Sequence, residues 1–123
     1  MRLVVAALMV AHGIAHLPGF LVSWQLRSFP EMPFRTTILG SSVDVGEAGI
    51  KAIGLAWLAT SVAFGILAVA TLTRAGWWQP VAYIAIGVST ALCFLGWPDA
   101  RLGLIANAVI LVLIVVGVRA GWM

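Results

Sequence analysis

Four long apolar stretches, at residues 3–26, 47–72, 77–97 and 98–118, constrain this sequence more than any other feature. A helix needs about 20 apolar residues to cross the roughly 30 Å hydrocarbon core of a bilayer, and each stretch reaches that length. Backbone polar groups find no partners in lipid, so such stretches cross the membrane as α-helices. The sequence therefore predicts an all-α fold, an integral membrane four-helix bundle, in a single domain over residues 1–123.

Composition agrees with a membrane protein and limits its functions. Hydrophobic residues make up 63% of the chain and charged residues 9%, and the mean hydropathy of +1.11 is above that of soluble domains. The formal net charge of +3 is scattered without a basic run, so we expect no nucleic-acid partner. Cys93, the single cysteine, excludes an intrachain disulfide and a thiolate metal cage, and we expect it to be a small buried hydrophobe.

Two histidines one helical turn apart, His12 and His16, are the most unusual feature of the first stretch. Ionisable side chains are costly inside a membrane, so their presence suggests a function. Residues spaced i, i+4 project from one helix face, so both rings can reach one ligand. Hydrogen bonds to Ser89, Thr90 or Asn107 would instead make them packing residues, and both interpretations stay open.

Small residues recur at every fourth position in the first two stretches, which favours close helix packing. They are Ala7, Ala11, Ala15 and Gly19 in the first stretch and Ala48, Ala52, Ala56 and Thr60 in the second. We expect these two rows to face each other, with the histidines at the edge of the contact.

A helix rises about 1.5 Å per residue, so sequence position gives the depth of each residue in the membrane. By this measure the intramembrane polar residues lie in one half of the bundle. Ser89, Thr90 and Asn107 lie at a depth similar to that of His16, toward the long connection at residues 27–46, where Glu47 opens the second helix. This arrangement predicts a polar pocket reached from the loop side. The candidate ligand-binding residues are His12, His16, Glu47, Asn107 and Trp97.

The connection at residues 27–46 is rich in proline, glycine and serine, so we expect a loop with a short interfacial piece at residues 36–39. A loop of this length can form a lid, or it can be a plain surface connection. Asp44 and Glu47 resemble a capping box at the start of the second helix. Glu47 and Lys51 have the i, i+4 spacing of a local ion pair.

Metal binding is the first functional hypothesis, with His12 and His16 as nitrogen ligands and Glu47 as an oxygen ligand. Gly13 follows His12, so the HExxH motif of zinc proteases is absent. Haem is a second hypothesis. Both histidines lie on one helix, so axial ligands on opposite faces of a haem would have to come from two chains of a dimer.

The same residues bear on three further activities. A quinone or lipid headgroup could be held by His16, Asn107 and Trp97. Proton-coupled transport would need a titrating histidine or Glu47 in the pathway, and four helices would need a dimer to enclose one. Nucleophilic hydrolysis is not supported, because no serine lies in a G-x-S-x-G turn.

Three motifs resemble those of an uncharacterised group of small bacterial four-helix integral membrane proteins. They are HGIAHL at residues 12–17, GEAGI at residues 46–50 and LGWPDARLG at residues 95–103. The resemblance covers nearly the whole chain and implies a bacterial source and a four-helix membrane domain, but no activity. The long first loop and the acid that opens the second helix are also similar to the layout of DoxX-like proteins, which lends weight to an accessory role beside a redox enzyme.

Charge distribution gives an expected topology. Four spans place both termini on one side, with Arg2, Arg74 and Arg119 and no acid, whereas the charges on the loop side sum to zero. The positive-inside rule counts only Lys and Arg, three on the side of the termini against four on the loop side, so it does not decide the orientation. On the difference in net charge we expect cytoplasmic termini in a bacterial inner membrane.

The predicted function is a non-catalytic binding or accessory subunit, a homo-oligomer or part of a larger complex, whose pocket holds a metal ion or small ligand. The alternatives are a membrane oxidoreductase, or its haem- or quinone-binding subunit, and a small dimeric proton-coupled transporter.

Overall fold

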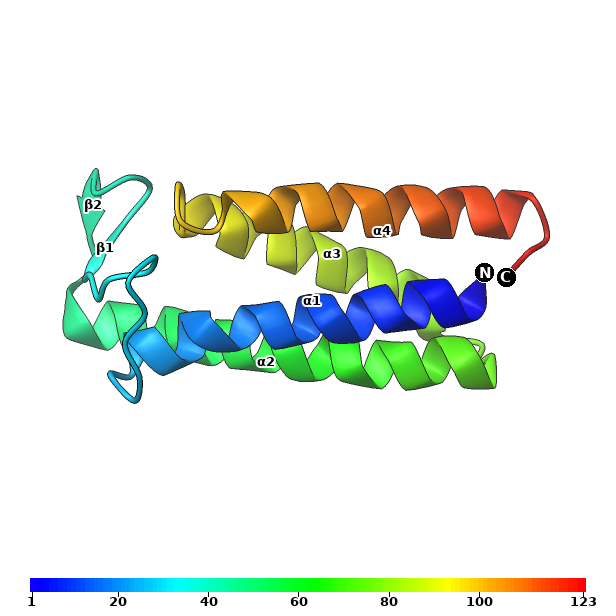
Figure 1. The fold of residues 1–123 in the computed structure, drawn as a ribbon, viewed down its shortest axis with the longest axis horizontal. Helices are drawn as coiled ribbons and strands as arrows, with labels where there is room; N and C mark the ends of the chain where they lie inside the picture. Colours follow the sequence, from blue (N-terminus) through cyan, green and yellow to red (C-terminus); the bar gives the residue numbers. More distant parts are fainter.

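The computed structural model describes residues 1–123 as four α-helices and one short hairpin (Figure 1). The helices are α1 (Arg2–Ser23), α2 (Gly46–Thr73), α3 (Trp78–Leu95) and α4 (Arg101–Arg119), and the strands are β1 (Thr37–Ile38) and β2 (Val43–Asp44). All four helices are long and apolar enough to cross a membrane. The predicted all-α membrane bundle is confirmed, and the chain is a multi-pass membrane protein.

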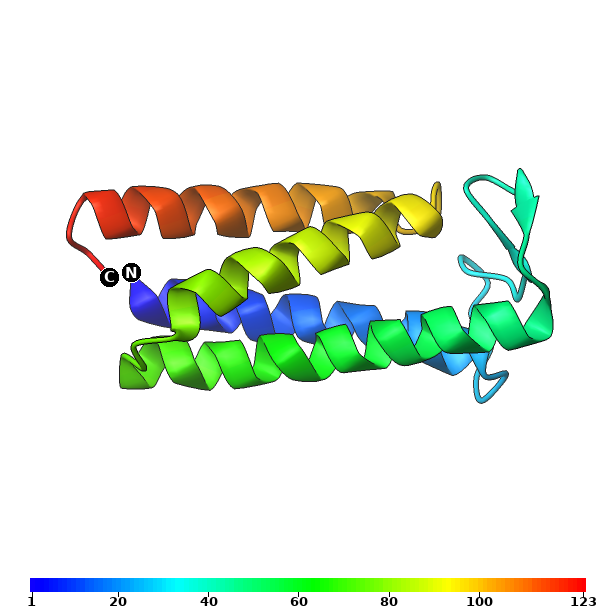
Figure 2. The same cartoon turned by 180° about the vertical axis from the view of Figure 1, so that it is seen from behind.

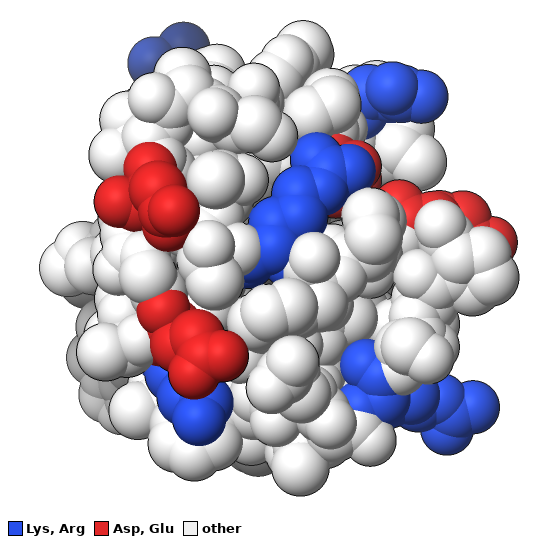
Figure 3. All heavy atoms as spheres, turned by 90° about the vertical axis from the view of Figure 1, so that its left-hand side faces the viewer, with Lys and Arg blue, Asp and Glu red and all other residues white.

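The bundle has two distinct ends. Both termini lie at one end and the hairpin lies at the other, as both ribbon views show (Figures 1 and 2). α1 and α2 run side by side, and α3 crosses from the α2 side of the bundle to the α4 side (Figure 2). The main apolar core includes Val5, Met9, Phe64, Leu67 and Ile114. Acidic and basic side chains mix at the hairpin end (Figure 3).

The contact between α1 and α2 differs from the predicted one. Ala11 and Ala15 are exposed, and of the first row Gly19 packs closely against α2, at Trp57, so the expected facing of the two rows is mostly wrong. Gly13, outside the row, also makes a close contact, because a Cβ there would lie 3.0 Å from the Ser61 carbonyl oxygen and 3.2 Å from Phe64 Cβ. The i, i+4 pattern identified small residues but not the helix that each one faces.

The connection between α1 and α2 forms a hairpin in place of the expected interfacial piece. Thr37 pairs with Asp44 and Ile38 with Val43, and three residues of the turn, Leu39, Gly40 and Ser41, have positive φ. The Leu39 N–H donates to the Leu95 carbonyl at 2.9 Å, and the Gly40 N–H donates to the Trp97 carbonyl at 3.0 Å. These two bonds attach the hairpin to the end of α3.

The polar residues at the start of α2 are also arranged differently from the prediction. Asp44 accepts the Gly46 N–H at 2.9 Å, and this bond, followed by one from Thr36, lowers the pKa of the Asp44 carboxyl. Asp44 thus binds the first amide of the helix, not the third as in a capping box. The expected ion pair between Glu47 and Lys51 does not form, because the Lys51 ammonium lies 5.5 Å from the centre of the Trp24 ring.

The predicted fourth helix also begins later than expected. Residues 96–100 form turns, in which the Ala100 N–H donates to the Gly96 carbonyl and the Arg101 N–H to the Pro98 carbonyl. The backbone bonds of these turns replace the first helical turn that Pro98 was expected to open.

Candidate ligand-binding site

Four polar side chains from three helices meet inside the bundle and are called the polar network below. His12 and His16 come from α1, Ser89 from α3 and Asn107 from α4, and each is at most 5% exposed. His12 Nε2 lies 2.7 Å from Asn107 Oδ1 and 3.2 Å from Ser89 Oγ. Ser89 Oγ also lies 2.8 Å from His16 Nε2 and 2.9 Å from Asn107 Nδ2. Ser89 is therefore the common partner of the other three.

The backbone determines which nitrogen of His16 carries the proton. His16 Nδ1 lies 2.7 Å from the His12 carbonyl oxygen, which can only accept, so Nδ1 is the donor. The ring is neutral, because no carboxylate bonds to it and a charge inside the membrane would be costly. Nε2 is then bare, and Ser89 must donate its only hydroxyl proton to it.

The proton on Ser89 in turn determines the orientation of Asn107. Having donated to His16, Ser89 Oγ can only accept from Asn107, so the amide nitrogen Nδ2 faces it. The reversed amide would place two oxygens together with no proton between them. Nδ2 also donates to Thr90 Oγ1 at 3.2 Å. Asn107 Oδ1 therefore faces His12 Nε2, which must carry the ring proton of His12.

One acceptor is left over when every proton has been assigned. Neutral His12 with its proton on Nε2 has a bare Nδ1, and this atom has no hydrogen-bond partner in the chain. Every fully buried side-chain nitrogen and oxygen has a hydrogen-bond partner, so the unpaired Nδ1 of His12 is not fully buried. His12 lines the main cavity. His12 Cε1, the ring atom bonded to Nδ1, lies 3.8 Å from the position of a Cβ on the cavity-lining Gly103, and the residue is only 5% exposed. We therefore infer that the cavity is the space in which Nδ1 can accept a hydrogen bond.

The cavity has a volume of about 450 Å³ and lies mainly between α1 and α4. Ala11, His12, Ala15 and His16 line it from α1. Gly103, Ala106 and Val109 line it from α4, and Trp57 and Cys93 come from the other two helices. Apart from the histidines and Asp99 at one end, the lining is apolar. The cavity therefore suits an uncharged apolar molecule.

Aromatic rings hold the two imidazoles in place. The centre of the His12 ring lies 4.9 Å from that of Phe64, and the His16 ring lies 5.1 Å from that of Trp57. The Trp57 ring fits only because Gly19 faces it, since a Cβ on Gly19 would lie 2.6 Å from the ring. Both imidazoles are thus fixed by packing as well as by hydrogen bonds.

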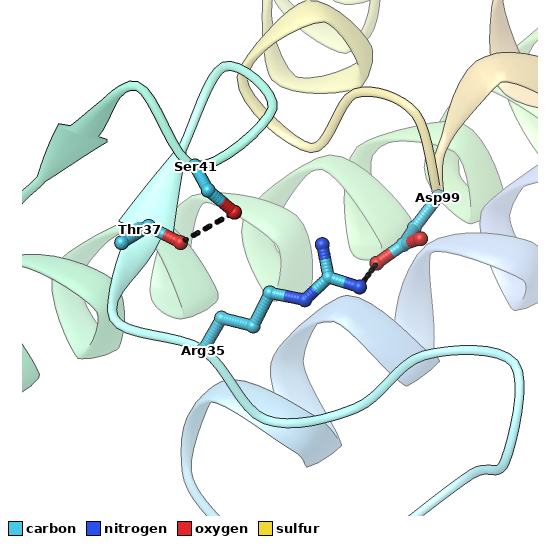
Figure 4. A network of polar contacts seen from close by, with 4 residues as sticks. All are labelled: Arg35, Thr37, Ser41 and Asp99. Carbon is cyan, nitrogen blue, oxygen red and sulfur yellow. Dashed lines mark hydrogen bonds and ion pairs between the residues drawn. The ribbon is translucent and has the colours of Figure 1, made fainter.

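A smaller cavity of about 80 Å³ adjoins the main one at the hairpin end, and the two share Met32 and Asp99. Arg35 from the connection reaches Asp99 with a nitrogen–oxygen distance of 3.6 Å (Figure 4). Thr37 and Ser41 of the hairpin lie beside this pair (Figure 4). Both residues of the ion pair line the smaller cavity, and Asp99 lines the main cavity as well.

The structure brings some of the predicted site residues together and leaves others apart. His12, His16 and Asn107 meet, with Ser89 and Thr90 as partners. Glu47 is exposed at the start of α2, and Trp97 is 47% exposed and lines the smaller cavity. No group of three His, Cys, Asp or Glu residues is placed to hold a metal ion. The expected set of His12, His16 and Glu47 is therefore not assembled as a metal site.

Trp57, Cys93 and Gly103 belong to the cavity, and sequence reasoning did not select them. Trp57 carried a usable signal, because every other tryptophan was expected at a helix end and this one lies in the middle of α2. Gly103 also carried a signal, because its i, i+4 spacing places it on the same helix face as Asn107.

Comparisons with protein-family models, with curated proteins and with solved structures find no match for this chain.

Proposed function

We propose that this protein is a membrane-embedded binding or accessory subunit that holds a small, uncharged, mainly apolar ligand in the α1–α4 cavity. The ligand donates one hydrogen bond, from a hydroxyl or an N–H group, to His12 Nδ1. One observation carries the proposal: the other side-chain donors and acceptors of the polar network have partners within the protein, whereas His12 Nδ1 has none and its residue lines the cavity.

The chemistry of the wall defines the ligand class. An apolar lining favours apolar surface and makes a charged ligand costly to desolvate. A bare imidazole nitrogen needs a donor, and a ligand with acceptors only would leave it unpaired. Both nitrogens of His16 already have partners, so the histidine pair offers one free atom and not a chelate. These points favour an organic ligand over a metal ion.

The same acceptor favours a second candidate, a quinol-binding subunit of a membrane oxidoreductase. A hydroquinone carries phenolic hydroxyl donors, which His12 Nδ1 can accept. The oxidised quinone has only carbonyl acceptors and cannot pair with this atom. This candidate therefore requires the cavity to prefer the reduced form.

Location and relatives belong to the proposal as well. We propose a bacterial inner membrane with cytoplasmic termini on net charge alone, because Arg2, Arg74 and Arg119 lie at the end of the bundle that carries no acid. The kinship with small bacterial four-helix membrane proteins, loosely DoxX-like, and assembly into homo-oligomers or larger complexes are proposed on the sequence alone.

Binding of 4-hexylphenol and of its methyl ether, 4-hexylanisole, to the purified protein in mild detergent tests the ligand class. The two probes differ in the hydroxyl donor, which is worth about 1 kcal/mol or roughly a factor of 5 in Kd. We expect the phenol to bind more tightly and to raise the Tm more. Equal affinity of the wild-type protein for both probes would contradict the proposal.

Two variants with added bulk separate the cavity from general effects of the substitution. Ala106→Phe fills the cavity from α4, so both probes should lose affinity. Ala108→Phe adds the same bulk to an exposed position that does not line the cavity, and binding should be unchanged. Equal loss in both variants would mean that the probes bind elsewhere.

A further inference from the structure

We infer that the ligand is a membrane lipid with a free hydroxyl group, admitted sideways from the bilayer through the gap between α1 and α4. This inference rests on the proposed function and names the ligand class and its route. The hydroxyl reaches His12 Nδ1, and the hydrocarbon chain extends through the gap into the surrounding lipid.

The first argument is the direction in which the cavity opens. His12 and His16 are buried at its inner wall, whereas Ala11 and Ala15, on the same helix and lining the same cavity, are exposed. On α4, Val109 lines the cavity and is 46% exposed. The opening therefore lies on the outer surface between two membrane-spanning helices, where lipid and not water is the neighbour.

The second argument is the small size of the side chains at this opening. The side chains that border the gap are small, because positions 11, 15 and 106 are alanine. Gly103 extends this feature inward, because a Cβ there would collide with Cys93 Sγ. Small residues usually let membrane helices approach each other, but here they border a cavity that holds an unpaired acceptor.

The third argument is that the hairpin end of the cavity is polar and partly covered. Asp99 and Met32 line the cavity there, and Arg35, which lines the adjoining smaller cavity, pairs with Asp99. Two backbone hydrogen bonds, from Leu39 and Gly40, hold the hairpin against the end of α3. A molecule arriving from water meets this charged pair first, whereas one in the bilayer meets alanine and apolar side chains such as Val109.

Cys93 provides a probe of the route, because it is the single cysteine, lines the cavity and is 1% exposed. The protein in lipid vesicles is treated with neutral methyl methanethiosulfonate or with its charged trimethylammonium-ethyl analogue. The Cys93 thiolate forms a mixed disulfide and methanesulfinate leaves, and intact mass gives the rate. We expect the neutral reagent to modify the native protein and the charged one to react at least tenfold more slowly.

Variants locate the path that the neutral reagent takes. Ala106→Phe should slow the reaction at least fivefold, whereas Ala108→Phe should leave the rate unchanged. Reaction of the wild-type protein with the charged reagent as fast as with the neutral one, with no slowing by Ala106→Phe, would place the route at the hairpin end and overturn the inference. No modification by the neutral reagent, under conditions in which the detergent-denatured protein reacts fully, would also overturn it.

Protection of Cys93 by two phenols tests the ligand class. We expect 4-dodecylphenol to protect as well as 4-hexylphenol, because the longer chain remains in the bilayer. Protection by the hexyl compound alone would indicate a closed cavity and would overturn the lipid assignment. If neither compound protects while the neutral reagent still enters past Ala106, the hydroxyl-binding function fails and the lateral route stands.

Discussion

His12 Nε2 on α1 lies 2.7 Å from Asn107 Oδ1 on α4. This hydrogen bond joins the first and last helices, although 94 residues of sequence lie between the two side chains. This bond leaves Nδ1 of His12 without a proton. An amide oxygen can only accept, so the ring proton of His12 must be on Nε2. The same contact closes the polar network and creates the free acceptor. Stability and binding therefore depend on the same pair of residues.

Replacing Asn107 by leucine should destabilise the fold. Leucine has a similar volume but leaves the His12 Nε2 proton without its closest acceptor, and Ser89 loses a donor. Leaving such buried groups unpaired costs about 1–3 kcal/mol. Thermal unfolding in detergent measures the change. Thr73→Val is the matched control, because the Thr73 hydroxyl bonds only to carbonyls of its own helix near the surface and its loss should cost well under 1 kcal/mol.

Ser89 and Asn107 should show strong energetic coupling. Either substitution to alanine breaks the bond between Asn107 Nδ2 and Ser89 Oγ, so the double variant should lose less stability than the sum of the two single variants. We expect a coupling of about 0.5–3 kcal/mol, as found for residues that share one network. The coupling is obtained from the free energies of unfolding in detergent of the wild-type protein, the two single variants and the double variant. Strict additivity would contradict the shared network.

Much of the fold was predictable because its determinants are local. Apolar length specifies a membrane helix whatever surrounds it, so all four helices were found and their ends differ from prediction by only a few residues. The depth calculated along each helix also correctly predicted that His16, Ser89 and Asn107 lie close together, because the rise per residue of an α-helix is constant.

The errors concern the choice of partner, which sequence spacing does not determine. Ala11 and Ala15 follow the pattern of a helix contact, yet they border the cavity because α2 packs against Gly13 instead. Lys51 is spaced to pair with Glu47, yet its ammonium lies over Trp24. Glu47 shares the loop-side half with the histidines but is exposed at the start of α2, so depth alone did not place it in the site.

Thiol labelling in intact cells should show the hairpin on the outer side of the membrane. Ser41 is exposed in the hairpin turn and Arg119 is exposed at the opposite end of the bundle. In a Cys93→Ala background, Ser41→Cys should react with an impermeant maleimide added outside, whereas Arg119→Cys should react only after lysis. The reverse pattern would place the termini outside the cell and contradict the proposed orientation.

Gly103 and Cys93 should behave as a complementary pair. A Cβ at position 103 would collide with Cys93 Sγ, so Gly103→Ala alone forces two helices apart or displaces the sulfur. Such overpacking costs about 1–3 kcal/mol. The double variant with Cys93→Ala removes the sulfur and should regain most of that stability, measured by thermal unfolding in detergent. Gly87→Ala is the control, because a Cβ there meets no atom within 4 Å and the helix should be unharmed or slightly stabilised. If Cys93→Ala fails to rescue Gly103→Ala, the contact between α3 and α4 at the cavity is not the one described.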